Sequence, residues 1–241
     1  MSFKSKVLAA AATLTLVGGA AGTLAAGPAN AATPSCGHRC VNVFSKKFSD
    51  FLTTKPGFVL DVWRQGAKVG QPIIMFQSSN SDPAEDFTVS LQGTVNDFVA
   101  AGLASPALAL HYGTDLAWEF EYSPNGVDSG LCVGLSSAPI NNAPVSLQPC
   151  GVSAKTVWVT DVQNIQRGGL FTFPFVPLIN GAGTNFSHPF VLTYPANGFP
   201  TDKPRPQLFV NNLTGFSHGI GTPIGSVNDT QLWGADFGVL R

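Results

Sequence analysis

Charged residues are scarce in this sequence, and neither sign is in excess. Of the 241 residues, 11% are charged, with Lys+Arg 13 against Asp+Glu 14 and a formal net charge of −1. A coiled coil needs far more charge and a nucleic-acid-binding surface needs a basic excess, so neither is expected. The hydrophobic content of 44% is too high for a disordered chain. The composition therefore indicates a folded, nearly neutral protein.

Residues typical of catalytic and metal sites are also few. The 4 histidines are spaced neither as zinc ligands nor as part of a Ser-His pair: His38, His111, His188 and His218. The segment 215–219 has the pattern of a nucleophile elbow, but the Gly-rich stretch after it cannot form the helix that this motif requires. We therefore predict a protein that is not an enzyme and has no cofactor and no metal ion.

A long hydrophobic run occurs only at the start of the sequence. Lys4 and Lys6 precede an apolar run, and Ala29-Asn-Ala31 has the small residues of a signal-peptidase site. We predict that residues 1–31 are a signal peptide cleaved before Ala32, and that the protein is secreted to the extracellular space. No later segment is predicted to span a membrane. The mature part has 11 basic against 14 acidic residues, a net charge of about −3.

Cysteines are few but even in number, at Cys36, Cys40, Cys132 and Cys150. An even count in an exported protein indicates disulfide bonds. Four cysteines allow three pairings. A zinc site is the alternative, but no second Cys/His pair stands at zinc-finger spacing.

Turn-forming residues divide the rest of the chain into short segments. The sequence has 26 Gly and 18 Pro, with β-branched or aromatic runs between them, and this pattern predicts an all-β fold. One short helix is expected over 97–103, with Thr94 or Asn96 as the N-cap. The predicted strands are 40–44, 58–63, 72–77, 107–112, 116–122, 131–135, 145–148, 157–162, 190–194, 207–210 and 232–239.

Three segments of the chain share one plan, in which an apolar pair opens a strand, a proline begins a second and an aromatic residue closes a third. The openings are Val59-Leu60-Asp61, Cys132-Val133-Gly134 and Val191-Leu192-Thr193. The prolines are Pro72, Pro144 and Pro206, and the closing aromatic residues are Phe87, Trp158 and Trp233. Because one such unit has too little apolar surface for a core, three units are expected to pack together.

With Gln231-Leu-Trp233 as its last closing motif, the chain resembles the ricin B-type β-trefoil lectins, whose repeats open with a Cys-Leu-Asp-like strand and close with Gln-x-Trp. The resemblance implies a β-trefoil with long insertions, in a single domain over 32–241 with repeats near 40–90, 107–162 and 186–241. It also favours local disulfides, Cys132 with Cys150 at nearly the family's intra-repeat spacing and Cys36 with Cys40. The long intervals between repeats depart from the family, so a β-sandwich or jelly roll is the alternative.

In lectins of this type, an Asp after the opening strand accepts hydrogen bonds from sugar hydroxyls, and an aromatic ring after the second strand stacks on the sugar. Only the first repeat has both, as Asp61 and Phe76, with Gln71 and Asn80 as further polar contacts. The resemblance implies a non-catalytic carbohydrate-binding protein, with a carbohydrate or cell-surface glycan as partner, no nucleic acid, and a monomeric state. The alternative is a structural, protein-interaction or inhibitor domain in which the sugar sites have eroded.

Two groups of acidic residues are considered separately. Glu119 and Glu121 extend from one side of a predicted strand and are the candidates for a third function, glycoside hydrolysis, although such acids on an edge strand are usually solvated. Asp82, Glu85 and Asp86 form an acidic loop without the alternating oxygen ligands of a calcium loop, so a solvated surface is expected there.

Overall fold

The computed structural model describes residues 40–48, 57–79, 82–151, 154–162, 166–168, 170–179, 188–195, 198, 201, 205–214 and 227–236. The predicted signal peptide, Cys36 and Asn80 lie outside these residues. Within the described part of the chain, no helix is long and apolar enough to cross a membrane.

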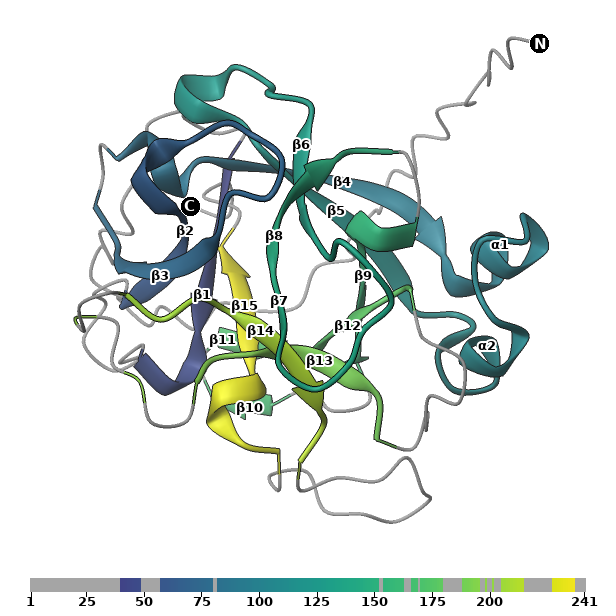
Figure 1. Cartoon of the computed structure of the whole chain (residues 1–241). Coiled ribbons are helices and arrows are strands. Elements are labelled where there is room, and N and C mark those ends of the chain that lie inside the picture. Colours follow the sequence, from purple (N-terminus) through teal and green to yellow (C-terminus); the bar gives the residue numbers. More distant parts are fainter. Residues whose placement is uncertain are drawn as a thin grey trace, which may run out of the picture.

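The described strands form three consecutive units with the same order: a barrel strand, a two-stranded hairpin, a short 3-10 helix and a second barrel strand (Figure 1). The first unit contains β1 (Cys40–Ser45), β2 (Phe58–Val62), β3 (Ile73–Gln77), η4 (Pro83–Glu85) and β4 (Phe87–Thr94). The second contains β5 (Leu116–Tyr122), β6 (Leu131–Gly134), β8 (Ser146–Pro149), η6 (Ala154–Thr156) and β9 (Val157–Thr160). The third contains β12 (Phe175–Pro177), β13 (Phe190–Thr193), β14 (Phe209–Asn212), η8 (Asp229–Gln231) and β15 (Trp233–Asp236).

The first and last strands of the units close into an antiparallel barrel. Pairing runs from β1 through β4, β5 and β9 to β12, and from β15 back to β1. A bridge between Phe173 and Trp233 closes the ring. The three hairpins meet through β7 (Ala143–Pro144), which pairs with β14, and through the bridge from Pro72 to Ser146. A barrel with three equivalent hairpins is a β-trefoil, so the predicted fold class is confirmed and the sandwich alternative is wrong.

The closing aromatic residues occupy the centre of the core. Phe87, Trp158 and Trp233 are each at most 1% exposed. Trp158 Nε1 donates a hydrogen bond to the Val133 carbonyl at 2.9 Å, and Trp233 Nε1 donates to the Leu192 carbonyl at 2.8 Å. Since the two acceptors stand at the same place in their units, this bond fixes the barrel strand to the hairpin in the same way twice.

The first and third units bind the backbone amide that lies two residues beyond the end of the hairpin. Thr214 N donates to Gln231 Oε1 at 2.8 Å in the third unit. Ser79 N donates to the Glu85 carboxylate at 3.0 Å in the first. Gln231 and Glu85 both stand two residues before the closing aromatic residue, so the closing motif holds the hairpin end in place.

The second unit reaches the same arrangement with a different residue. Thr156 stands at the place of Gln231 and is too short, so Gly151 N donates instead to Oε1 of Glu119, a residue of barrel strand β5, at 3.0 Å. The Thr156 hydroxyl donates to the same carboxylate oxygen. Glu119 is buried by these contacts.

A helical insertion explains part of the long interval between the first two repeats. Helices α1 (Val95–Ala100) and α2 (Pro106–Tyr112) lie between β4 and β5, on the opposite side of Figure 1 from hairpin β2–β3. The strand predicted over 107–112 is wrong, because Ser105 caps the helix and buried Leu108 and Tyr112 are one helical turn apart. The predicted helix exists but begins earlier, where Thr94 forms a capping box.

The remaining described elements are short. They are a hairpin of β10 (Gln166–Gly168) and β11 (Leu170–Thr172), and the 3-10 helices η2 (Lys46–Phe48), η3 (Trp63–Gln65) and η5 (Pro124–Gly126).

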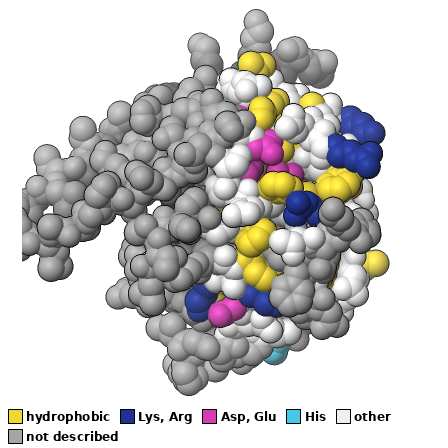
Figure 2. Space-filling view, turned by 90° about the vertical axis from the view of Figure 1, so that its left-hand side faces the viewer, with side chains coloured by type: hydrophobic (Ala, Val, Ile, Leu, Met, Phe, Trp, Pro, Cys, Tyr) yellow, Lys and Arg dark blue, Asp and Glu magenta, His cyan; other side chains and the backbone are white. Residues whose placement is uncertain are grey.

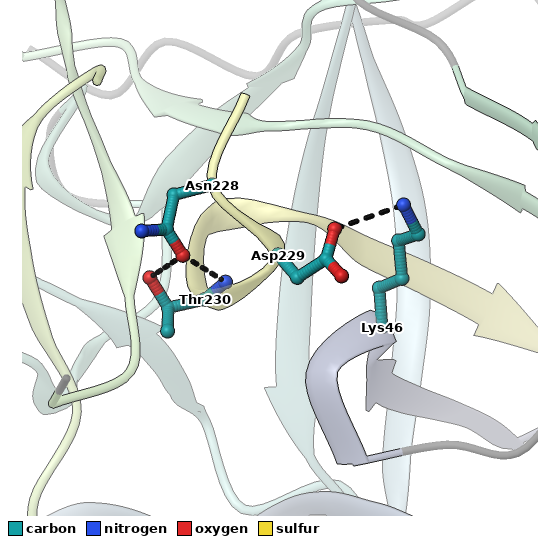
Figure 3. Close-up of polar contacts among 4 residues, drawn as sticks. All are labelled: Lys46, Asn228, Asp229 and Thr230. Carbon is teal, nitrogen blue, oxygen red and sulfur yellow. Dashed lines mark hydrogen bonds and ion pairs between the residues drawn. The ribbon is translucent and has the colours of Figure 1, made fainter. Parts of the chain in front are cut away.

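Polar contacts attach η8 to the first unit (Figure 3). The Asn228 side chain accepts hydrogen bonds from the amide and hydroxyl of Thr230, which caps η8. Lys46 Nζ lies 2.9 Å from Asp229 Oδ1. Because both charged groups are partly exposed, this ion pair contributes at most about 1 kcal/mol.

The predicted disulfide between Cys132 and Cys150 is present and joins β6 to the residue after β8. The bond closes a loop of sequence separation 18, which corresponds to about 3 kcal/mol in the chain-entropy account. Cys40 is also disulfide-bonded, and its predicted partner, Cys36, lies outside the described residues.

The tryptophan hydrogen bonds can be tested by substitution. Trp233→Phe and Trp158→Phe should each lower the free energy of unfolding by about 1–3 kcal/mol, because each leaves a buried carbonyl without a donor. Trp118→Phe is the matched control, since Trp118 is half-buried and donates no hydrogen bond among the described residues. Urea unfolding measures all three, and equal losses in all three variants would contradict the role given to the indole N–H.

Candidate functional site

A pocket of about 220 Å³ lies beside hairpin β2–β3. Figure 2 shows the face of the molecule on that side, where acidic side chains adjoin hydrophobic and basic ones. The pocket is lined by Asp61, Val62, Trp63, Arg64, Gln65, Ile74, Phe76, Asp82 and Ala84. Asp61 and Phe76, the pair singled out from the sequence, therefore line one pocket.

Asp61 faces the pocket because of the alternation along β2. Leu60 and Val62 belong to the hydrophobic core, so the residue between them points to the other side of the strand, toward η4. Asp61 is only 3% exposed, yet its carboxylate accepts no hydrogen bond from any described residue. Its oxygens are not among the fully buried atoms that lack a partner, so the pocket is where a hydrogen-bond donor can reach them.

Aromatic rings form two parts of the pocket lining. Phe76 is half-buried, and the Arg205 guanidinium lies 3.9 Å from its ring centroid, a cation–π contact. Trp63 lines the pocket next to Asp61 but was not among the predicted site residues. Its place directly after the opening strand of the first repeat is the sequence signal that would have found it.

Backbone strain accompanies the turn at the pocket rim. Arg64 and Gln65 have φ values of 56° and 55°, in the left-handed region that non-glycine residues seldom adopt. The Gln71 side-chain amide donates to the Trp63 carbonyl and stabilises this turn. Gln71 is buried and is not part of the pocket lining. Asn80, the fourth predicted contact, lies outside the described residues.

The acidic loop is folded onto the pocket. The expected solvated surface is wrong for Glu85 and Asp86, which are 2% and 0% exposed, because η4 turns the loop back against β2. Oxygen atoms of Asp61, Asp82 and Glu85 all lie within 4.8 Å of one another. Asp82 Oδ1 accepts hydrogen bonds from Gln65 Nε2 and Ala84 N, each at 2.9 Å.

Burial changes the protonation of this group of carboxyls. Loss of solvation raises the pKa of Asp61 to about 7, with the charge of Asp82 raising it further and that of Arg205 lowering it. Loss of solvation likewise raises the pKa of Glu85 to about 8, against the hydrogen bond from Ser79 N, with Asp61 and Asp82 adding to the rise. Two of the three carboxyls therefore change charge near neutral pH.

The carboxylates considered for glycoside hydrolysis have structural partners. Strand β5 pairs with β4 on one side and with β6 and β9 on the other, so the expected edge strand is wrong. Glu119 holds Gly151 N, as described above, and Glu121 accepts a hydrogen bond from Gly130 N at 2.7 Å. Neither residue lines the pocket.

No family model and no curated protein sequence matches the chain. Among solved structures, the designed threefold-symmetric protein ThreeFoil has a TM-score of 0.48 and 13% identity, over 81% of this chain and 96% of that one. The Rhizoctonia solani agglutinin has a TM-score of 0.43 and 16% identity, over 82% and 94% of the two chains. A mutant C-terminal domain of an earthworm lectin, in complex with 6'-sialyllactose, has a TM-score of 0.39 and 12% identity, over 82% of this chain and 98% of that one. These values are low, and the fold assignment rests on the strand pairing described above.

The raised pKa values predict how stability depends on pH. Unfolded Asp and Glu ionise near pH 4, so between pH 5 and 9 the folded state binds more protons at Asp61 and Glu85 than the unfolded state does. The free energy of unfolding in EDTA should therefore fall as the pH rises through this range. Glu85→Gln should reduce that fall by about 1–3 kcal/mol, because the amide does not titrate in this range. The amide still accepts the hydrogen bond from Ser79 N, so the fold is kept.

Chemical denaturation of the two proteins at pH 5, 7 and 9 measures this difference. Glu121→Gln is the control, because it removes a carboxylate away from the pocket and should leave the pH dependence unchanged. Parallel curves for the wild type and Glu85→Gln would contradict the assignment.

Proposed function

We propose that the protein is a secreted, non-catalytic carbohydrate-binding protein whose site is the pocket of the first unit. The observation that carries this proposal is Asp61, a residue only 3% exposed that lines a pocket with aromatic walls and has no hydrogen-bond donor among the described residues. Sugar hydroxyls would supply the missing donors, and the faces of Trp63 and Phe76 would cover the apolar C–H surface of the sugar.

The same geometry favours carbohydrate binding over the alternative, a scaffold whose sugar site has eroded. In an eroded site, Asp61 would bond to backbone amides and Phe76 would be fully buried in the core. Instead, no backbone amide of the part of the chain that the structure describes bonds to Asp61, and Phe76 is half-buried at the pocket. The small volume favours a single sugar ring over an extended chain.

The equivalent places in the other two units support one site per chain. Gly134 and Thr193 stand where the first unit has Asp61, and neither has a carboxylate. Thr193 Oγ1 is moreover occupied within the protein, since it accepts a hydrogen bond from Gln231 Nε2 at 3.2 Å and donates to the Val191 carbonyl at 2.8 Å.

Export of the protein is part of the proposal. The Cys132–Cys150 disulfide is suited to an oxidising compartment, and the leader over 1–31 would direct the chain there. The Glu119 and Glu121 contacts described above support a non-catalytic role.

The test is a broad glycan array probed with the protein from Ala32 onward. Binding to a defined sugar is expected, and Asp61→Ala should weaken it at least about tenfold, because a charge-assisted hydrogen bond contributes about 1.5–3 kcal/mol. Glu121→Gln should bind as the wild type does, and tryptophan fluorescence would verify that both variants are folded. No retention of the wild type on any glycan, or undiminished binding by Asp61→Ala, would sink the proposal.

A further inference from the structure

We propose that Asp61, Asp82 and Glu85 form a binding site for a divalent cation of the calcium class. The separation of their oxygen atoms is the first reason. Calcium binds oxygen at about 2.3–2.6 Å, so two oxygens on one ion are at most about 5 Å apart. The three carboxylates offer one oxygen each within 4.8 Å of one another, inside that limit. Magnesium requires near-ideal octahedral geometry at about 2.0–2.1 Å and gives up its water ligands reluctantly, so a group of three protein carboxylates suits it less well.

The second reason is independent of the clustering, and it is the lack of any donor for Asp61. This side chain is 97% buried, lines the pocket, and has no hydrogen-bond donor among the described residues. Loss of solvation and the charge of Asp82 both raise the pKa of Asp61, against the charge of Arg205. An additional positive charge is therefore what the position of Asp61 lacks.

Comparison with the third unit shows which hydrogen bond the first unit lacks. In the third unit, Gln231 Oε1 accepts from the hairpin amide, and its Nε2 donates to Thr193, which stands at the place of Asp61. In the first unit, Glu85 accepts from the corresponding amide but has no N–H to donate. In the third unit this contact joins a donor, Gln231, to an acceptor, Thr193. In the first unit the same two places hold two acids, Glu85 and Asp61. A cation between them would restore the missing attraction.

A further unpartnered oxygen lies near this group. The Tyr122 hydroxyl is fully buried and has no hydrogen-bond partner among the described residues. Loss of solvation raises the pKa of this phenol, and the charges of Asp61, Asp86 and Asp82 add to the rise, so the hydroxyl lies within their electrostatic reach. A neutral oxygen of this kind would complement carboxylate ligands at an ion that takes six to eight oxygen ligands.

The pocket provides the route for the ion. Asp61 and Asp82 both line it, so an ion and its remaining water ligands would reach the carboxylates without unfolding the chain. The site uses one oxygen from each residue, which leaves the second oxygen of Asp61 for a sugar hydroxyl. The cation site does not depend on the proposed carbohydrate binding.

The experiment measures metal binding directly. EDTA-treated, dialysed protein at pH 8 is heated with 10 mM CaCl₂ or with NaCl of equal ionic strength, and CaCl₂ is titrated by calorimetry. For a dissociation constant of about 0.1–1 mM, calcium should raise the midpoint of unfolding by about 3–10 °C. Magnesium should give a smaller shift.

Three variants distinguish the site from a general effect of salt. Asp61→Asn and Glu85→Gln should each abolish the calcium shift, because each removes a negatively charged ligand. Both variants should still fold, because the amide oxygen can accept every hydrogen bond that the carboxylate accepts from the described residues. Glu121→Gln, which removes a carboxylate elsewhere, should keep the full shift. Absence of a shift beyond the NaCl control in the wild type, or a full shift in Asp61→Asn, would overturn the proposal.

Terbium luminescence provides a second readout, because terbium replaces calcium in oxygen sites and is excited by a nearby indole. Emission on excitation of tryptophan should appear with the wild type and be lost in Asp61→Asn. Trp63→Phe should reduce the emission while the calcium shift remains. Emission unchanged by Asp61→Asn would place the ion elsewhere and overturn the proposal. Calcium binding without any glycan binding would overturn only the proposed function.

Discussion

The architecture depends on how each unit holds the backbone amide just beyond its hairpin, because this contact attaches the hairpin to the barrel. The third unit uses the Gln231 amide, the first uses the Glu85 carboxylate, and the second uses Glu119 from the barrel itself. One structural requirement is thus met by three chemical solutions. The residue that accepts this hydrogen bond in each unit determines which polar side chains remain available to bind a ligand. Glu119, one of the two carboxylates considered for glycoside hydrolysis, accepts the hydrogen bond from Gly151 N.

The first unit differs from the third at the positions that matter for binding. Phe87 replaces a tryptophan and loses the N–H that Trp233 donates to a hairpin carbonyl. Glu85 stands where the third unit has a glutamine and lacks the N–H that Gln231 donates to Thr193, the counterpart of Asp61. These changes make the first unit poorer in internal hydrogen bonds, and they leave Asp61 buried beside another acid. The same departures from the repeat produce the pocket and the acidic group on which the two proposals rest.

Sequence patterns predicted the fold better than the details of the site. Turn residues and alternation placed most hairpin strands within a few residues, and the three-repeat plan with its resemblance to the ricin B-type lectins predicted the trefoil. Strand β4 was not predicted, although residues 87–91 alternate regularly; a bulge follows between Leu91 and Gly93. The Ala-Leu-Ala-Leu run of α2 alternates like a strand, although Ser105 and Pro106 start a helix. Asp61 and Phe76 followed from the family resemblance, whereas the approach of Glu85 to Asp61 depends on how η4 folds over β2.

Scarcity of charge gives the acidic group its significance. In a sequence with only 14 acidic residues, three oxygens within 4.8 Å of one another and mostly out of solvent are not a by-product of a highly charged surface. Such an arrangement is costly unless a proton, a cation or a donor from a ligand compensates it. A proton, a cation and a ligand's donor group would each act on the carboxylate oxygens of Asp61. Under the two proposals made above, sugar binding is coupled to pH and to cation concentration, since whatever neutralises Asp61 also changes what it can accept from a hydroxyl group.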